Sequence, residues 1–117
     1  MPSQRTRMNA TKRADALFSK IVRSRGVCEA RWDWTDFPCA GNLQCCHIIS
    51  RRYRAIRWAE DNARCMCAAH HIYYTHRPLE WELANEDRWD DLRARALHAP
   101  PEKAVAAVER LKALADV

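Results

Sequence analysis

The sequence LQCCHIISRRYRAIRWAEDNARCMCAAHHIYYTHRPLEW, residues 43–81, holds four of the five histidines and four of the six cysteines of the chain. Within it, residues 43–49 and residues 63–67 predict two short strands. Residues 50–62 are too charged to be buried and predict an extended loop between those strands. A helix is predicted over about residues 68–76, ending before the next proline. The stretch therefore predicts a strand, a loop, a second strand and a helix in that order.

The segments before this stretch predict a helix and a loop. Residues 11–25 carry apolar side chains at helical spacing, and Gly26 follows as a C-cap, so we predict a helix there. Residues 1–9 predict a flexible basic arm. Residues 27–42 lack a sustained periodicity and predict a loop or loose hairpin. The aromatic side chains of this loop are predicted to pack locally rather than to stack on bases; they are Trp32, Trp34 and Phe37.

The C-terminal third predicts two helices. Residues 79–97 are strongly helical in composition, with Trp81 and Trp89 available for a packed face, and two prolines then interrupt the pattern. Pro101 suits the first turn of a last helix over residues 102–115.

Length and charge bound the class of protein. A chain of 117 residues predicts one domain, with a modest core that a bound metal would help to stabilise. The formal net charge of +5 is uneven: residues 1–78 have a balance of +8 and residues 79–117 a balance of −3. A basic N-terminal two-thirds suggests a polyanionic partner, most simply nucleic acid, although a solvated basic surface has the same composition.

The cellular compartment follows from what the sequence lacks. No apolar run approaches the roughly 18 residues of a membrane span, and the N-terminal residues lack the apolar region of a secretory signal. We therefore expect a cytoplasmic protein with no membrane partner. Thiols stay reduced in the cytoplasm, where clustered Cys and His more often bind metal than form disulfides. The adjacent Cys45 and Cys46 also argue against the alternative of a disulfide framework.

Four residues predict a structural metal site. Cys67 and His70 have the spacing that lets a strand end and the first turn of a helix present two ligands to one ion. A second pair is needed, and Cys28 and Cys39 are the natural candidates because they lie near the two ends of the upstream loop. Together they would form a closed zinc site, whereas the alternative is a set of buried free thiols. The spacing leaves two competitors for these places, Cys45 and Cys65.

A second group of residues suits phosphodiester hydrolysis. His47 ends the first predicted strand, and His71 follows His70 on the predicted helix. Neighbouring residues on a helix point about 100° apart, so His70 can face the zinc while His71 faces another site. One imidazole would deprotonate a water, a divalent cation would stabilise the phosphorane, and Asn62 would orient the base. Loop arginines would hold the neighbouring phosphates; they are Arg51, Arg52, Arg54 and Arg57.

The same residues carry a resemblance to a known family. The order of Cys, His, Asn and Cys-x-x-His-His resembles the HNH, or ββα-metal, endonucleases. The likeness is closest to small phage-encoded members with the pattern G-H-[FYI]-x-x-R, [LT]-R-[FW]-x-x-x-N and Q-C-x-x-C-[NH]. In this chain the three segments read CHIISR (46–51), IRWAEDN (56–62) and MCAAHH (66–71). The resemblance runs from about Cys28 to Thr75 and does not include the C-terminal helices.

This resemblance implies a β-hairpin and a helix that hold a catalytic divalent ion. It places His47 as the general base and His71 as a ligand of that ion. It places Asn62 where the family orients the base or braces the loop, and Cys67 and His70 where the family often has its second zinc pair. It also implies that the helix lies in or near the DNA minor groove, with little base readout.

The chain departs from the family pattern at the residue before the base. Many members have Asp or His there as a ligand of the catalytic ion, whereas this chain has Cys46, an unusual ligand for Mg²⁺. Either Cys46 serves and favours a softer ion, or the ligand comes from elsewhere. The candidates elsewhere are Gln44, Thr75 and His76. The upstream cysteine pair is also more widely spaced than the usual C-x-x-C, and His70 replaces a more usual Cys.

We therefore predict a single α+β domain with a small ββα-metal core and a structural zinc site. Residues 1–26 would form the basic arm and helix, residues 27–78 the zinc-stapled core and residues 79–117 the C-terminal helices. The predicted function is a metal-dependent DNA endonuclease of the phage type that nicks or cuts DNA with low sequence specificity. Its catalytic cation would be Mg²⁺ or Mn²⁺, with Ni²⁺ or Zn²⁺ as alternatives.

Two other functions stay open. The chain could be a non-catalytic, zinc-stabilised nucleic-acid-binding module, in which His47 and His71 are structural. It could instead be a structural or partner-binding protein that uses its acidic C-terminal helices as a docking surface. Besides DNA, the candidate partners are a second copy of the chain and a phage packaging or recombination protein. If the chain is phage-encoded, the expected location is the cytoplasm of the host cell.

Overall fold

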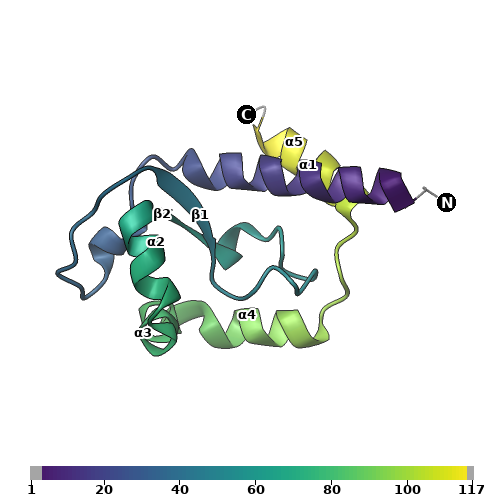
Figure 1. The fold of residues 1–117 in the computed structure, drawn as a ribbon. Coiled ribbons are helices and arrows are strands. Elements are labelled where there is room, and N and C mark those ends of the chain that lie inside the picture. The colour runs from purple at the N-terminus through teal and green to yellow at the C-terminus, as the bar shows by residue number, and fades with distance from the viewer. Residues whose placement is uncertain (1–3, 116–117) are drawn as a thin grey trace.

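The computed structural model describes residues 4–115, and for residues 4–8 only the backbone is described. Over these residues the chain is a small α+β domain with five α-helices and one two-stranded sheet (Figure 1). The elements in chain order are α1 (Gln4–Arg23), a 3-10 helix (Glu29–Trp32), β1 (Leu43–His47), a second 3-10 helix (Glu60–Asn62), β2 (Ala63–Cys67), α2 (Ala68–Thr75), α3 (Pro78–Ala84), α4 (Glu86–His98) and α5 (Ala104–Ala115). The predicted order of strand, loop, strand and helix is confirmed.

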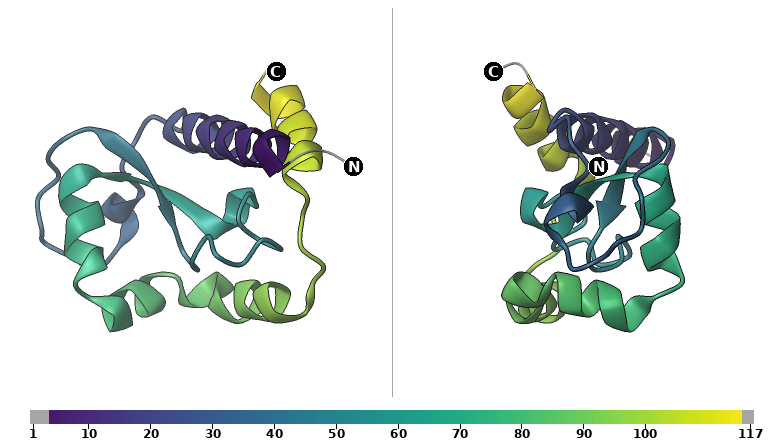
Figure 2. Two further views of the ribbon diagram at one scale, coloured as in Figure 1. Left: turned by 45° about the vertical axis from the view of Figure 1, so that its right-hand side comes forward. Right: turned by 90° about the vertical axis from the view of Figure 1, so that its left-hand side faces the viewer.

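The two strands form an antiparallel hairpin that is covered on both faces. Its register pairs Leu43 with Cys67 and His47 with Ala63. Successive side chains of a strand point to opposite faces, so Cys65 packs on the side of α1 and α5 while Met66 packs on the side of α2. Because both faces are covered, all five residues of β2 are buried. Figure 2 shows the hairpin between these two layers of helices.

The first and last helices pack against each other and against the sheet (Figures 1 and 2). Phe18 and Val22 of α1 recur one helical turn apart, and they share a buried cluster with Val108 and Leu111 of α5. The prediction of a flexible arm was wrong for residues 4–9, which are helical. They include good helix formers and neither Gly nor Pro, so the helix extends beyond its apolar stripe. Residues 1–3 of the predicted arm lie outside the described part of the chain.

The prediction of one long helix over residues 79–97 was wrong. The helix is interrupted at Asn85, which separates α3 from α4 and has φ −115° and ψ 21°. Its buried side-chain amide donates a hydrogen bond to the carbonyl of Trp81 at 2.7 Å, in the way that Asn competes with helical backbone bonds. Beyond this break, Leu92 of α4 packs on Ile48 and on Ile56 of the connecting loop. The last helix begins at residue 104, two residues later than predicted.

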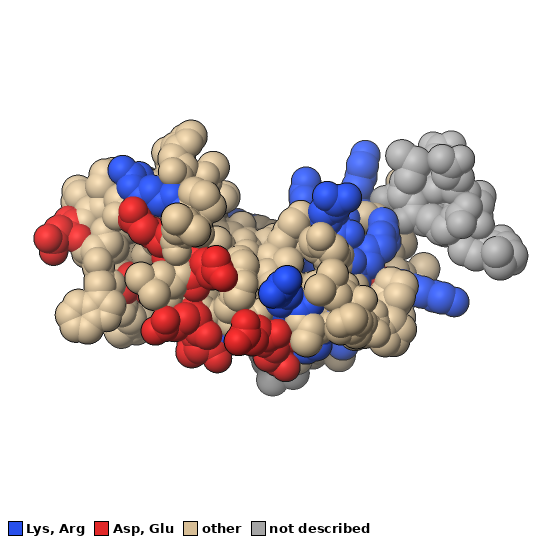
Figure 3. All heavy atoms as spheres, turned by 90° about the horizontal axis from the view of Figure 1, so that it is seen from below, with Lys and Arg blue, Asp and Glu red and all other residues tan. Residues whose placement is uncertain are grey.

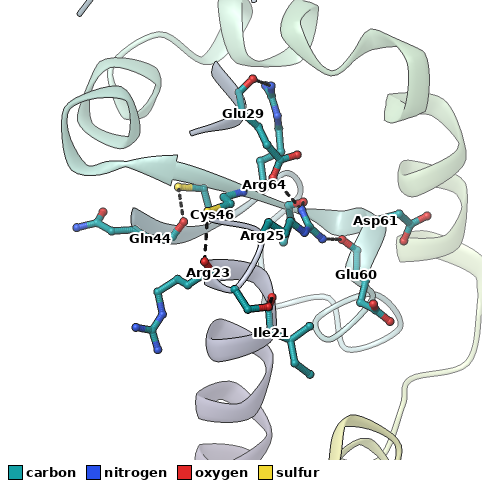
Figure 4. A network of polar contacts seen from close by, with 12 residues as sticks. Ile21, Arg23, Arg25, Glu29, Gln44, Cys46, Glu60, Asp61 and Arg64 are labelled. Carbon is teal, nitrogen blue, oxygen red and sulfur yellow. Dashed lines mark hydrogen bonds and ion pairs between the residues drawn. The ribbon is translucent and has the colours of Figure 1, made fainter. Parts of the chain in front are cut away.

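Arg25 fastens the end of α1 to the start of β2 (Figure 4). Its guanidinium donates to the carbonyls of Glu60 at 2.9 Å and Ala63 at 3.0 Å, and to the Glu29 carboxylate at 2.9 Å. Glu29 in turn accepts the backbone N–H of Cys65 at 2.6 Å. These bonds join the 3-10 helix, α1 and the sheet, and they hold the upstream loop beside the hairpin.

Candidate functional site

Four predicted ligands come together at the start of α2. The ligand atoms of Cys28, Cys39, Cys67 and His70 all lie within 4.8 Å of one another. The Nδ1 atom of His70 is 3.7 Å from Sγ of Cys28, 3.5 Å from Sγ of Cys39 and 3.1 Å from Sγ of Cys67. A tetrahedral zinc ion with ordinary bond lengths separates its sulfur and nitrogen ligands by about 3.6 Å. This Cys3His cluster could therefore hold a metal ion such as zinc.

The backbone at the start of α2 presents two of these ligands. Cys67 ends β2 and is also the N-cap residue of α2, with the extended φ of −67° and ψ of 161°. Its sulfur accepts the backbone N–H of His70 at 3.4 Å, which is the bond that an N-cap side chain makes. The end of β2 and the first turn of α2 thus direct the side chains of Cys67 and His70 toward the same possible metal position.

The loop that carries Cys39 lies close against the same helical turn. The N–H of Ala69 donates to the carbonyl of Ala40 at 3.0 Å. Gly41, the next residue along this loop before β1, has φ +85°. A Cβ atom at Gly41 would lie 2.8 Å from the Cβ of Ala68, closer than two carbon atoms can approach. Glycine therefore serves both the left-handed turn and the close approach of the two backbones.

The electrostatics of the cluster favour a cation. Burial raises the pKa of Cys67, but hydrogen bonds from the backbone amides of His70 and Ala40 and from the His70 ring outweigh it and lower the pKa to about 6. Desolvation and the neighbouring thiols of Cys28 and Cys67 raise the pKa of Cys39 to about 11. The Cys67 thiol is therefore easily ionised, whereas the neighbouring Cys39 thiol is hard to ionise. A divalent cation removes this conflict because it stabilises several thiolates together.

The two competing cysteines do not join the cluster. Cys45 and Cys65 face each other across the hairpin, and both pack on the side of α1. Cys65 was an alternative ligand because it lies two residues before Cys67. The strand ends at Cys67, however, where the chain turns into α2, so the two side chains diverge.

A second site lies between β1, α2 and α3. It is a pocket of about 280 Å³ whose lining includes Cys46, His47, His71 and Thr75. The two histidines predicted for catalysis therefore share one pocket, although one is on a strand and the other on a helix. Cys46 is buried, which raises the pKa of its thiol, and its sulfur lies 4.0 Å from the carbonyl of Gln44 (Figure 4).

His47 is held in one tautomer. Its Nε2 lies 2.8 Å from the carbonyl of Arg57, and a carbonyl can only accept a hydrogen bond. Nε2 therefore carries a proton, which leaves Nδ1 of the neutral ring as an acceptor. Burial lowers the pKa of His47 below its ordinary value of 6.5, and the charges of Arg51 and Arg57 act in the same direction. The ring is thus neutral at pH 7.

Asp15 of α1 binds the side chain of Arg57, the residue whose carbonyl orients His47. Its carboxylate accepts Nε of Arg57 at 3.0 Å, Nη2 of Arg57 at 2.7 Å and Nε1 of Trp58 at 2.9 Å. Sequence reasoning missed Asp15, whose one signal is that it is the first acid of the chain, on an otherwise basic helix. The Arg57 guanidinium pairs with this carboxylate, and only 15% of the Arg57 side chain is exposed. Arg57 is therefore less open to a phosphate than the sequence predicted. The other three loop arginines are exposed; they are Arg51, Arg52 and Arg54.

Asn62 braces the loop between the strands. Its side chain is buried, its Oδ1 accepts the N–H of Ile49 at 2.9 Å, and its Nδ2 donates to the carbonyls of Ile49 at 3.0 Å and Ile56 at 3.1 Å. The family resemblance allows two roles for this Asn, orienting the base or bracing the loop. The bonds of the Asn62 side chain brace the loop, and among the described residues none of them goes to the His47 ring.

The candidates for a second ligand of the catalytic ion, besides His71, differ in how they lie relative to the His71 ring. Nδ1 of His71 lies 2.6 Å from Oε1 of Gln44, which β1 directs toward α2. The Thr75 hydroxyl donates to the backbone carbonyl of His71 at 2.6 Å, and His76 is exposed at the end of α2. Gln44 is therefore the side chain that approaches His71 most directly, and Cys46 lines the same pocket.

In comparisons with protein-family models, with curated proteins and with solved structures, none matches this chain. Among the described helices, none combines the length and the apolar character needed to cross a membrane.

Proposed function

We propose that this chain is an HNH-type, metal-dependent endonuclease that hydrolyses phosphodiester bonds of DNA. The observation that supports this most strongly is one pocket whose lining includes both His47, oriented by the Arg57 carbonyl, and His71, whose ring contacts Gln44. A cluster that can hold zinc lies at the start of the helix that carries His71. A zinc ion on Cys28, Cys39, Cys67 and His70 would have a structural role, because its four ligands leave no open position.

In this proposal His47 is the general base. Its unprotonated Nδ1 accepts a proton from the attacking water, and its neutral state at pH 7 keeps that nitrogen available. The Arg57 carbonyl accepts the hydrogen of Nε2 at 2.8 Å, so it orients the ring before the reaction and stabilises the imidazolium afterwards. The network from Asp15 through Arg57 keeps that carbonyl in place.

His71 and Gln44 would hold the catalytic cation. Without an ion, Nδ1–H of His71 donates to Oε1 of Gln44 at 2.6 Å, so the ring would have to take its other tautomer to offer Nδ1 to a metal. The distance between the two atoms is near the roughly 3 Å that separates neighbouring ligands of a six-coordinate ion with bonds of about 2.1 Å. One nitrogen and one amide oxygen suit Mn²⁺, Ni²⁺ or Zn²⁺ and tolerate Mg²⁺. A cation held there would supply Lewis-acid stabilisation of the phosphate and of the leaving oxygen.

The exposed arginines of the loop would bind the DNA backbone. Arg51, Arg52 and Arg54 lie on the segment that joins β1 to β2, so phosphates held there flank the pocket. Guanidinium groups bind phosphates without reading bases, which accounts for the expected low sequence specificity. The alternative of a non-catalytic binding module needs the same arginines and the same zinc cluster, so only turnover separates the two.

The test is cleavage of supercoiled plasmid by the zinc-loaded chain with added Mg²⁺, Mn²⁺, Ni²⁺ or Zn²⁺. We expect nicking with at least one metal and a loss of about 100-fold or more in His47→Ala. The matched control is His98→Ala, which removes an exposed histidine at the end of α4 and should leave cleavage unchanged. Plasmid binding without cleavage under any metal would favour the binding module. Equal cleavage by the wild type and His47→Ala would overturn the assigned base.

A further inference from the structure

A second hollow lies apart from the proposed catalytic site. It is a groove of about 640 Å³ between the loop after α1 and the helices α2, α3 and α4. Its lining shares only Tyr74 with the pocket of His47 and His71. The proposed nuclease chemistry makes no use of this groove, so its surface needs an explanation of its own.

Large apolar side chains of this groove are open to solvent. Trp34 has a relative exposure of 106%, Trp32 of 67% and Leu83 of 65%. Single exposed apolar residues are ordinary, but three in the lining of one groove form a patch of the kind that marks an interaction site. The prediction that the two tryptophans pack locally was therefore wrong.

The floor of the groove is joined by buried polar contacts. Arg64 and Asp33 form an ion pair at 3.0 Å, with 5% and 8% of their side chains exposed. The Tyr74 hydroxyl also donates to Asp33 at 2.6 Å, and the Arg64 guanidinium lies over the Trp81 ring at 5.6 Å from its centre. A floor that is already ordered lowers the conformational entropy lost when a ligand binds.

The charges around the groove are acidic. Glu80, Glu86 and Asp87 contribute to its lining, and the latter two form no ion pair with any of the side chains described, those of residues 9–115. Its two arginines are already engaged, because Arg64 pairs with Asp33 and Arg88 donates to the carbonyl of Asp61 at 3.0 Å. Figure 3 shows the side of the molecule that carries α3 and α4, where Asp and Glu gather on one half and most of the Lys and Arg lie on the other.

We propose that this groove binds an arginine-bearing segment of a partner protein. The exposed indoles offer faces on which a guanidinium can stack, and the unpaired carboxylates offer acceptors for its N–H groups. DNA would be repelled by the same carboxylates. A second copy that met this surface through a two-fold axis would place acid against acid, so a basic peptide is the occupant whose charge fits.

The test uses a fluorescein-labelled hexapeptide of alternating arginine and alanine, with an arginine-to-glutamate version as the probe of opposite charge. We expect the arginine peptide to bind by fluorescence anisotropy and the glutamate peptide not to bind. Trp34→Ala and the double variant Glu86→Gln with Asp87→Asn should each weaken binding about fivefold. Glu109→Gln, which removes an exposed acid of α5 on the opposite side of the molecule, is the matched control and should not change it.

The same samples separate this proposal from the proposed nuclease function. Zinc content and plasmid cleavage should be unchanged in Trp34→Ala, because the residue lines neither site. Equal peptide binding by the wild type and both groove variants would overturn the proposal. So would tighter binding of an oligothymidylate that Trp34→Ala abolishes, or self-association in sedimentation that the double variant abolishes.

Discussion

Asp15 links α1 to the candidate base, and Asp15→Ala tests that link. In the wild type its carboxylate accepts two N–H groups of Arg57 and one of Trp58, at 3.0, 2.7 and 2.9 Å. The carbonyl of the same Arg57 accepts the proton on Nε2 of His47. Removing the carboxylate should therefore both destabilise the fold and change the surroundings of His47.

The expected loss of stability follows from burial. Trp58 is 0% exposed, so its indole N–H would lose a partner away from water, at a cost of roughly 1–3 kcal/mol. The Arg57 and Asp15 side chains are 15% and 27% exposed, so their ion pair is partly solvated and contributes about 1 kcal/mol. We expect a decrease of about 3 kcal/mol in the free energy of unfolding, or roughly 10 °C in Tm for a domain of this size.

Two measurements check this expectation. Urea unfolding of the zinc-loaded chain should give the stability difference, and it should shrink as the pH falls below the ordinary carboxyl pKa of 3.8. The sign follows because Arg57 and Trp58 outweigh burial and hold the folded-state pKa of Asp15 below that value, so the wild type loses this contribution on protonation. NMR titration should show a lower pKa for His47, because the carboxylate and the oriented carbonyl both favour the charged ring.

The matched control is Asp91→Ala. Asp91 is an acid on a helix whose side chain is 70% exposed, and its ion pair with Arg95 at 3.0 Å should contribute less than about 0.5 kcal/mol. A decrease below about 1 kcal/mol in Asp15→Ala, with an unchanged pKa of His47, would refute the proposed link between α1 and the base.

Three further predictions concern the core. Elemental analysis should find about one zinc per chain. Removing the zinc with a chelator should unfold the region around α2 and lower the helical circular dichroism signal, and a metal-free chain with an unchanged spectrum would contradict this. Asn62→Ala leaves three backbone groups of the loop without their partner and should lower the free energy of unfolding by about 3 kcal/mol in urea, whereas a loss under about 1 kcal/mol would mean that the brace is dispensable. Gly41→Ala should speed zinc release to a coloured chelator, because its φ is +85° and its Cβ would meet the Cβ of Ala68 at 2.8 Å. Gly26→Ala is the control, since its φ is +82° but its Cβ would make only an ordinary contact with the Ser24 carbonyl at 3.9 Å; equal zinc release by both variants would count against the close approach.

Features fixed over short distances in the chain could be predicted from sequence. The strands, their connecting loop and α2 follow from local patterns, and Cys67 and His70 lie within one helical turn. Cys28 and Cys39 could be chosen because they lie near the two ends of one loop, which can bring them together over one ion. The choice against Cys65 could not be made from spacing alone, since it depends on the residue at which β2 ends and α2 begins.

Features that depend on contacts between distant segments could not be predicted. Asp15 and Arg57 are 42 residues apart, and an arginine among other loop arginines resembles a phosphate ligand until its partner is known. The break at Asn85 depends on the burial of one amide within a sequence of good helix formers. Trp34 lies in an irregular loop, where no periodicity separates a buried aromatic residue from an exposed one.

The most direct test of the central proposal is chemical rescue of His47→Gly with imidazole. The variant leaves room beside a pocket of about 280 Å³, so free imidazole can enter the place of the missing ring. With zinc content and fold unchanged, we predict that plasmid cleavage is lost in the variant and returns as the concentration of neutral imidazole rises. Cleavage by the unrescued variant at the wild-type rate would contradict the role of His47 as the general base, and so would a defect that imidazole leaves unchanged at every pH.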